Sequence, residues 1–419
     1  MDTQDKKHDE HFDVVVIGGG ASGLFAAGRA AERGKKVLVL EKNRTLGEKL
    51  LLTGGGRCNI TNATYDTREF LAHLGKGTEP LFSAFAQFDV AKTFAFFERR
   101  GLSLVVEARG RAFPASQNAG DVLKVIESYA REGGAIIRVK TKVTRILEKK
   151  GRVVGVETAK SVIGADAVIV ATGGLSHPET GSTGDGFTFL RDLGHSVEDP
   201  AADLVPIEVH DAWVKALSGT SLSFMKMTVY ANGKKAFAKK GKVLFTHFGL
   251  SGPLVLNAAR AIGTLLAQGR VTIAIDAYPD TDIGALEKDI IRVFDQAKNK
   301  MIKNVADDIM PHGMAEVFPL LFPHIPLDKK VHSITKEERR LIVDTLKALP
   351  VSVVGLMGMD RAIVSDGGVP LDEIDTKYMR SRLYPNLYVT GDMIHVNRQS
   401  GGYSLQIAWT SGYVAGSAA

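Results

Sequence analysis

The first 42 residues contain strand-like and helix-like patterns of apolar residues in turn. Residues 12–20, "FDVVVIGGG", form a β-branched apolar run that ends in glycine, which is typical of a buried parallel strand. Residues 21–34, "ASGLFAAGRAAERG", have the alanine-rich composition of a helix that ends at a glycine, and residues 35–42, "KKVLVLEK", predict a second buried strand. Strand, helix and strand within about 30 residues predict a βαβ unit and an α/β fold.

The pattern changes near residue 204. Strand-like segments then predominate, and residues 224–249 carry an Asn-Gly hairpin signal at 232–233. Residues 283–348 have helical periodicity, and after residue 356 the glycine-rich strand and helix pattern returns. We therefore expect a discontinuous cofactor domain (1–203 and 357–419) and an inserted domain (204–356) with a β-rich part (204–278) and a helical part (279–348).

Composition narrows the class of protein. The 419 residues are 44% hydrophobic and 24% charged, which excludes disordered and fibrous proteins. The net charge of +6 includes a lysine cluster at 234–242, which we interpret as a solvated hairpin and not as a nucleic-acid patch. A single cysteine excludes an internal disulfide and fits a reducing compartment, and no grouping of His, Asp and Glu predicts a metal site.

The N-terminal residues are polar and lack the apolar segment of a secretory signal. No stretch of 18 apolar residues runs without charges or helix breakers. We therefore expect a cytoplasmic protein with no membrane partner, and the sequence carries no signal for an oligomeric state.

Gly18, Gly20 and Gly23 form a G-x-G-x-x-G motif between the first strand and the first helix. In dinucleotide-binding folds these glycines permit a tight turn, the approach of a pyrophosphate and close helix–strand packing. Glu41 ends the second strand 18 residues after Gly23. A carboxylate there accepts hydrogen bonds from a ribose diol and repels a 2′-phosphate, so the motif predicts FAD or NAD and not NADP.

Motifs near the other end of the chain favour FAD. Residues 387–392, "LYVTGD", predict a strand ending in Gly391 and Asp392, where the carboxylate can bind ribityl hydroxyls. Residues 401–403, "GGY", begin the last predicted helix, whose N-terminus would stabilise the negative charge of a reduced flavin. Residues 170–174, "VATGG", are another strand that ends in glycine. Together these motifs predict a non-covalent FAD extended across the discontinuous domain.

The chain resembles the HI0933/YhiN family of FAD-dependent oxidoreductases from about residue 12 to residue 416. The resemblance rests on six ordered segments: "GGGASGLFAA", "LGEKLLLTGGGRCNITN", "GGLSHPETGSTGDG", "LFTHFGLSGP", "GGVPLDEID" and "SGGYSLQIAWTSGYVAG". It implies a Rossmann-like FAD-binding domain, similar to those of glutathione reductase and fumarate reductase, with an insert of a β-barrel and helices that covers the flavin. Family members have been described as amine oxidases acting on aminoacetone and as reductases of unsaturated steroid-like substrates, so the resemblance does not fix the substrate.

By the same resemblance, residues 54–59 form a loop that passes along the flavin ring. Arg57 can pair with a phosphate or stay on the surface, and we favour the phosphate; Asn59 is expected to hold the loop together through its amide. Cys58 has no partner cysteine, so we interpret it as a small packed residue and not as a redox thiol. The expected cofactor-binding residues are Gly18, Gly20, Ala21, Ser22, Gly23, Glu41, Lys42, Gly54, Gly55, Gly56, Arg57, Cys58, Asn59, Val143, Thr172, Gly173, Gly391, Asp392, Gly402, Tyr403, Ser404 and Leu405.

One segment departs from the family pattern. His395, Asn397 and Arg398 stand in "GDMIHVNRQSGGYS", where members often carry acids. Either an anionic substrate group is bound there, or the segment is a surface loop that has drifted. Weak candidates for catalysis are His247, His395 and Tyr403, although a lone histidine in an apolar stretch, such as His247, is more often a core residue.

We expect hydride transfer between an organic substrate and flavin N5. The favoured activity is an NAD(P)H-linked reductase of a small conjugated or keto compound, with a flavin amine oxidase and an RNA-binding or RNA-modifying flavoprotein as alternatives. No second G-x-G-x-x-G follows a strand, so NAD(P)H would bind only transiently, and the absence of C-x-x-C excludes disulfide-reductase chemistry. We expect a small-molecule substrate and no nucleic-acid partner.

Overall fold

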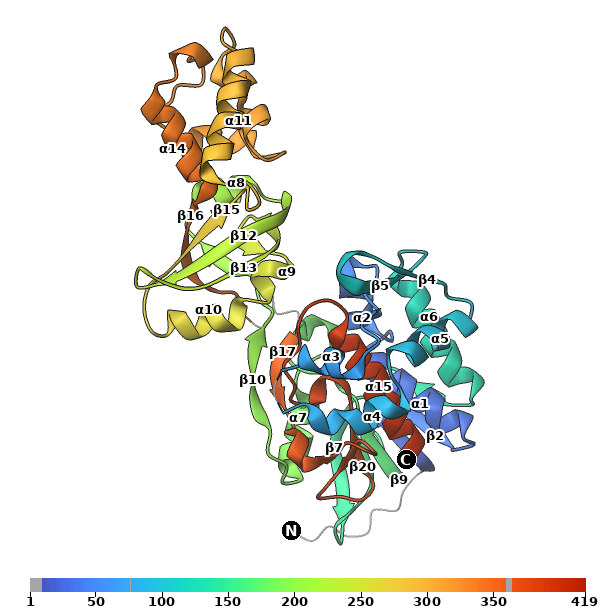
Figure 1. Cartoon of the computed structure of the whole chain (residues 1–419). Coiled ribbons are helices and arrows are strands. Elements are labelled where there is room, and N and C mark those ends of the chain that lie inside the picture. The colour runs from blue at the N-terminus through green and yellow to red at the C-terminus, as the bar shows by residue number, and fades with distance from the viewer. Residues whose placement is uncertain (1–9, 76, 359–363) are drawn as a thin grey trace. The chain divides into compact units, whose positions relative to one another are not determined.

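The computed structural model describes residues 10–75, 77–358 and 364–419. These residues form two compact units, one of residues 10–202 and 364–419 and the other of residues 203–358 (Figure 1). Each unit has its own hydrophobic core and is described by itself.

The first unit is built on a sheet that includes β1 (Glu10–Ile17) among its inner strands. β1 pairs in parallel with β2 (Val37–Leu40) on one side and with β9 (Val162–Val170) on the other. All residues of β2 are buried, as are the last four of β1, and this explains why β2 and the end of β1 are uninterrupted apolar runs in the sequence. The predicted βαβ unit is thus confirmed, with α1 (Ala21–Glu32) as its helix.

Further strands extend this sheet on both sides. The sheet continues beyond β2 through β6 (Ile136–Arg138), and beyond β9 through β20 (Leu387–Val389), β19 (Arg380–Ser381) and β18 (Ile374–Asp375). β7 (Val143–Lys149) and β8 (Arg152–Thr158) form a hairpin that joins β9 through β8. Residues far apart in the sequence, from β1 and β20, therefore share one sheet.

The last helix, α15 (Tyr403–Ala418), packs closely on α1. A Cβ added at Gly412 would lie 2.6 Å from the carbonyl oxygen of Ser22, and one at Gly416 would lie 2.3 Å from that of Ala26. Only glycine permits this approach, which fixes the start of α1 against the C-terminal helix. Trp409 of α15 is fully buried and donates a hydrogen bond of 2.9 Å from Nε1 to the carbonyl oxygen of Ile60.

Shorter elements surround the main sheet, many in segments to which the hydrophobic pattern assigned no element. They are α2 (Glu48–Leu52), β3 (Thr61–Asn62), α3 (Thr67–Ala72), α4 (Phe82–Gln87), α5 (Val90–Arg99), β4 (Leu104–Val106), β5 (Arg111–Pro114), α6 (Ala119–Glu132), α7 (Asp185–Asp192), β10 (Glu198–Asp203) and β17 (Val364–Gly368). β3, β5 and β4 form a separate antiparallel sheet, and β10 pairs with β17.

The second unit contains a closed barrel with the strand order β11, β14, β13, β12, β15, β16. The strands are β11 (Ile207–Val209), β12 (Ser221–Ala231), β13 (Lys234–Thr246), β14 (Gly249–Ser251), β15 (Val271–Asp276) and β16 (Leu349–Leu356). The predicted hairpin turn joins β12 and β13, and Asn232 and Gly233 both have positive φ, 50° and 77°, as a primed turn requires.

Helices complete the second unit. The predicted helical part contains α11 (Ile283–Gln296) and α14 (Lys336–Lys347), and a capping box formed by Thr335 and Glu338 begins α14. The β-rich part also contains α8 (Ala212–Ala216), α9 (Pro253–Leu256) and α10 (Ala259–Leu266), which the pattern did not predict. Among the described residues, no helix combines the length and the apolar composition needed to cross a membrane.

Candidate functional site

The glycine motif begins where β1 ends, and its three glycines differ in what surrounds them. A Cβ at Gly18 would lie 2.5 Å from the carbonyl oxygen of Ala171, and one at Gly23 would lie 2.0 Å from that of Gly18. A Cβ at Gly20, by contrast, would meet nothing within 4 Å. The first and third glycines are thus required by the fold, whereas Gly20 leaves open space beside the first N–H groups of α1, as a bound pyrophosphate needs.

Glu41 follows β2 and is largely buried. Its Oε2 accepts a hydrogen bond of 2.7 Å from the backbone N–H of Gly19, and its Oε1 accepts one of 2.8 Å from that of Asn43. Each carboxylate oxygen has a second lone pair that remains able to accept from a hydroxyl. Glu41 therefore fits the predicted ribose contact and also holds the glycine turn, a role that the sequence did not predict.

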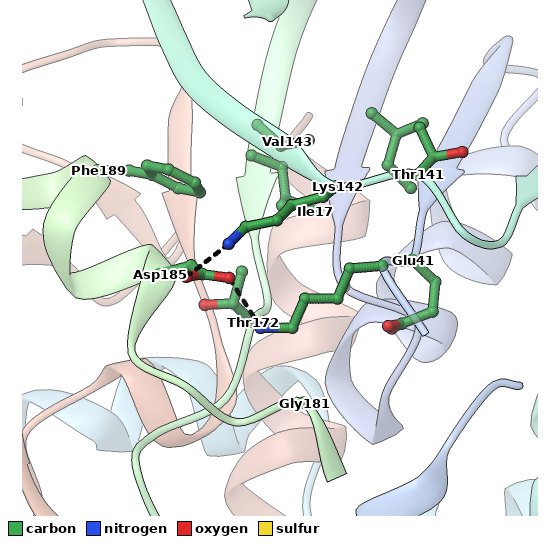
Figure 2. Close-up of a pocket in the computed structure, with 12 residues that line it drawn as sticks. Ile17, Glu41, Thr141, Lys142, Val143, Thr172, Gly181, Asp185 and Phe189 are labelled. Carbon is green, nitrogen blue, oxygen red and sulfur yellow. Dashed lines mark hydrogen bonds and ion pairs between the residues drawn. The ribbon is translucent and has the colours of Figure 1, made fainter. Parts of the chain in front are cut away.

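A pocket that opens to solvent lies beside Glu41 (Figure 2). Five of its lining residues were predicted to bind the cofactor, namely Gly18, Glu41, Lys42, Val143 and Thr172. Its other lining residues are Ile17, Leu40, Thr141, Lys142, Gly181, Asp185 and Phe189. The pocket thus combines the ends of β1, β2 and β9 with the starts of β7 and α7.

Charged side chains converge on one edge of this pocket (Figure 2). Lys42 Nζ lies 2.7 Å from Asp185 Oδ2 and also donates to Thr183 Oγ1, and Lys142 Nζ lies 3.6 Å from Asp185 Oδ1. Burial alone raises the pKa of Asp185, but the hydrogen bond and charge of Lys42, with the charge of Lys142, outweigh it and hold that pKa below its ordinary value. Asp185 is therefore ionised at neutral pH.

A second charged group lies at the end of β20. Asp392 Oδ2 is 3.1 Å from Lys49 Nζ, and Asp392 Oδ1 is 3.8 Å from Nε of Arg398. Burial raises the pKa of Asp392, and the charges of Lys49 and Arg398 outweigh it and lower that pKa. Lys49 also donates a hydrogen bond of 2.6 Å to Ser176 Oγ. Asp392 was predicted to face the ribityl chain. Lys49 was not predicted, because it is neither a glycine nor an acid of the motifs.

The structure corrects both sequence interpretations of Arg398. Its side chain is fully buried and donates to the carbonyl oxygens of Gly391, Ile394 and Val396, at 3.1, 2.8 and 3.3 Å. Arg398 is therefore neither a residue of a drifted surface loop nor an anion-binding residue, because its guanidinium hydrogen-bonds to the backbone of residues 391–396. Its partners are backbone carbonyls, which every sequence has, so the sequence could not reveal them.

The loop at 54–56 consists of three exposed glycines with φ between 58° and 85°. A Cβ at Gly55 or Gly56 would meet nothing within 4 Å, so both present bare backbone to solvent, as the approach of a flat ring requires. Arg57 donates to Glu107 Oε1 at 2.8 Å and to Gln117 Oε1 at 2.7 Å. The predicted phosphate contact of Arg57 stays a prediction.

The two residues after Arg57 behave differently from each other. Cys58 is fully buried, and burial raises the pKa of its thiol to about 12, which fits a packed residue and not a redox thiol. Asn59 was expected to hold the loop through its amide, but Asn59 Oδ1 is buried and has no hydrogen-bond partner among the described residues. That expectation is wrong for the amide oxygen, which leaves its hydrogen-bonding capacity unused within the loop.

The remaining predicted residues lie at the same sheet edge or at the start of α15. β20, β9, β1 and β2 are parallel neighbours, so the residues that follow them share one edge of the sheet. Gly402 precedes α15 with φ 101°, and a Cβ there would lie 2.4 Å from the carbonyl carbon of Thr61. Further predicted residues are Ala21 and Ser22 in the first turn of α1, Gly173 after β9, and Tyr403, Ser404 and Leu405 in the first turn of α15.

The catalytic candidates fall into different units. Tyr403 is buried against the rings of Phe70 and His73, with centroids 4.9 Å away in both cases, and burial raises the pKa of its hydroxyl. His395 is half-buried in the same unit. His247 lies in the barrel unit, is exposed between β13 and β14, and contacts the ring of Phe248. The expectation that His247 is a core residue is therefore wrong. In the described part of the chain, no group of three or more His, Cys, Asp or Glu could hold a metal ion.

Comparison with known proteins places the chain. Residues 12–418 match the family model described as HI0933-like protein Rossmann domain. The chain is 27% identical over 404 residues to the ribosomal RNA dihydrouridine synthase of Escherichia coli (strain K12), covering 96% of this chain and 97% of that protein. It is 29% identical over 413 residues to the 3-dehydro-bile acid delta(4,6)-reductase of Clostridium scindens, covering 97% and 98%.

Among solved structures, that of 3-ketosteroid-delta4-(5alpha)-dehydrogenase from Rhodococcus jostii RHA1 is similar, with a TM-score of 0.55 and 16% identity over 99% of this chain and 98% of that one. This likeness concerns the fold. The predicted Rossmann-like FAD-binding fold with an inserted barrel is confirmed, as is the predicted enzyme class of flavin-dependent oxidoreductases. The chain therefore belongs to the HI0933-like family.

Proposed function

We propose that this chain reduces a carbon–carbon double bond conjugated to a carbonyl group, with FAD as hydride carrier and NAD(P)H as transient reductant. The observation that carries the cofactor in this proposal is the open space at Gly20, which directly precedes α1 and follows Gly19, whose N–H donates to the buried carboxylate of Glu41. Two relatives support the reaction class, because uridine and a 3-oxo steroid with double bonds at positions 4 and 6 both contain such a conjugated bond.

The residues of the first unit fit FAD along the edge of the main sheet. Glu41 would accept from the ribose diol in the pocket of Figure 2, and the N–H groups beside Gly20 would bind the pyrophosphate. Asp392 would accept from ribityl hydroxyls, and the glycines at 54–56 would lie against the ring. The N-terminus of α15, at Gly402, would stabilise negative charge on the reduced ring.

Bound FAD supplies hydride chemistry at its N5 atom, and the protein positions the substrate and provides a proton. Reduction of the conjugated bond adds a hydride to the carbon distal from the carbonyl and a proton to the carbon next to it. Tyr403 and His395 are the candidate proton donors of this unit. A tyrosine hydroxyl is protonated at neutral pH, as a donor requires, and burial raises the pKa of Tyr403 further.

Anaerobic reduction tests this proposal. The purified protein is mixed with NADH or NADPH without oxygen, and the flavin absorbance at about 450 nm is followed. We expect bleaching by one nicotinamide, then recovery on addition of a conjugated enone or a uracil compound. Bleaching by aminoacetone and not by NAD(P)H would support the amine oxidase instead. Protein that retains no bound flavin after incubation with FAD would contradict the proposed cofactor.

A second candidate is reduction of uridine within RNA. The barrel unit carries the basic residues Lys239, Lys240 and Lys242, all exposed on β13, and Lys240 lies directly opposite Lys226 of β12. Phe224, on a bulge of β12, is 67% exposed and has a positive φ of 61°. Lysines beside an exposed aromatic ring are typical of surfaces that bind single-stranded nucleic acid.

A binding titration with ribosomal RNA at several salt concentrations tests this candidate. RNA binding through these lysines should weaken steeply as salt rises, and Lys240→Ala with Lys242→Ala should flatten that dependence. Lys288→Ala with Lys300→Ala, which removes two lysines of the helical part, is the matched control. Absence of RNA binding at low salt would contradict this candidate and favour the small-molecule reductase.

A further inference from the structure

We propose that Asp185 makes the adenosine pocket selective for nucleotides whose ribose carries no phosphate, by engaging two lysines that would otherwise bind that phosphate. The inference rests on the proposed binding of FAD in this pocket. It concerns residues outside the glycine motif, and it assigns Asp185, Lys42 and Lys142 a joint role in choosing the cofactor.

The three side chains come from separate parts of the fold. Lys42 follows β2, Lys142 precedes β7, and Asp185 is the first residue of α7. Both ammonium groups lie near the same carboxylate, at 2.7 Å for Lys42 and 3.6 Å for Lys142. Figure 2 shows the side chain of Lys142 turned toward Asp185. The side chains of Lys42 and Asp185 are only 21% and 23% exposed, so salt screens their pairing less than that of a surface pair.

The charges of the pocket balance only because Asp185 is present. Its lining residues include two acids, Glu41 and Asp185, and two bases, Lys42 and Lys142, so their formal charges cancel. Without the carboxylate of Asp185 the sum would be +1, and two ammonium groups would be available beside the predicted ribose position. Glu41 alone would then no longer suffice to repel a 2′-phosphate, because the lysines would attract it.

Such selectivity matters for the proposed reaction. NADPH has the same adenosine group as FAD but carries a phosphate on its ribose. A reductase that takes electrons from NADPH must hold FAD in this pocket while NADPH binds and leaves elsewhere. A balanced pocket accepts the uncharged ribose of FAD and gives no advantage to the phosphorylated one.

Competition with two nucleotides tests the inference on the full-length holoprotein. Adenosine 2′,5′-bisphosphate or adenosine 5′-monophosphate is added, and the release of FAD is followed by the rise in flavin fluorescence. The measured quantity is the ratio of the concentrations at which the two nucleotides release FAD to the same extent. For Asp185→Asn we expect this ratio to shift about fivefold in favour of the bisphosphate relative to wild type, the value of one partly exposed charge contact.

Asp192→Asn is the matched control, because it removes the same charge from the exposed far end of α7 and should leave the ratio at the wild-type value. Adding Lys142→Met to Asp185→Asn should return the ratio toward wild type. An unchanged ratio in an Asp185→Asn protein that still binds FAD would overturn the inference alone.

Should Asp185→Asn fail to fold, the single variant Lys142→Met, at a side chain 59% exposed, keeps the test decisive. It should shift the ratio in the opposite direction, against the bisphosphate, and an unchanged ratio would again overturn the inference. A wild-type protein that binds no FAD would overturn the proposed cofactor site, and the inference with it.

Discussion

Replacement of Gly20 by serine should weaken cofactor binding while leaving the stability of the fold nearly unchanged. Gly20 precedes α1 with φ −88° and ψ −167°, a conformation open to any residue, and a Cβ there would meet no atom within 4 Å. Serine is also a preferred residue at a helix N-cap. We therefore expect the free energy of unfolding of the flavin-free protein to change by no more than about 0.5 kcal/mol.

The same substitution should strongly weaken cofactor binding. The serine side chain would fill the space through which a pyrophosphate reaches the N–H groups of α1, and such a steric conflict costs about 1–3 kcal/mol, or roughly fivefold to 150-fold in affinity. Gly23→Ala gives the contrasting case, because its Cβ would lie 2.0 Å from the carbonyl oxygen of Gly18. That contact is with backbone, so we expect a loss of about 3 kcal/mol of stability.

Two measurements on each variant decide the matter. Urea unfolding of flavin-free protein gives the stability, and quenching of FAD fluorescence on titration gives the affinity. The reasoning is refuted if Gly20→Ser binds FAD as tightly as wild type, or if it is destabilised as much as Gly23→Ala. In either case the open space at Gly20 would have no connection with a bound pyrophosphate.

Three further predictions follow from buried groups. Cys58, whose thiol has a pKa of about 12, should react with Ellman's reagent at pH 8 only after unfolding; rapid labelling of native protein would contradict its burial. Arg398→Met should cost about 3–5 kcal/mol in urea unfolding, because it leaves three carbonyl oxygens without their buried donor and removes one of the two cations beside Asp392, and a loss below about 1 kcal/mol would contradict this. The lowered pKa values of Asp185 and Asp392 mean that their stabilisation is present above their unfolded pKa of about 3.9 and is lost as the pH falls through the folded values. Asp392→Asn should therefore flatten the loss of stability as the pH falls below about 3.9, and an unchanged slope would refute the assigned shift.

The local pattern of the sequence was sufficient to predict the edge of the main sheet at which the cofactor is expected to bind. β2 and the last four residues of β1 are fully buried and appear as continuous apolar runs, and Gly18 and Gly23 are required by contacts within a few residues or with the neighbouring strand. These features are readable because the physical cause lies close by in the chain or recurs in every fold of this type.

Long-range contacts explain what the sequence did not reveal. Asp185 lies in "GSTGDG", a segment that has no strand directly before it, and its importance arises from Lys42, 143 residues away in the chain. Arg398 resembles a polar loop residue until its carbonyl partners are known. His247 stands in an apolar segment, yet the turn between β13 and β14 exposes it. In each case the partner or the exposure is set by packing and not by neighbouring residues.

The glycines of this chain provide evidence for a cofactor that is independent of the family resemblance. Where a glycine has a positive φ or a neighbour that a Cβ would strike, as at Gly402, the fold itself explains it. Gly20 has neither, so the fold gives no reason for the absence of a side chain there. Its position between a helix N-terminus and the carboxylate of Glu41 is suited to a molecule that carries both a pyrophosphate and a ribose. The backbone of the first unit is thus suited to a dinucleotide.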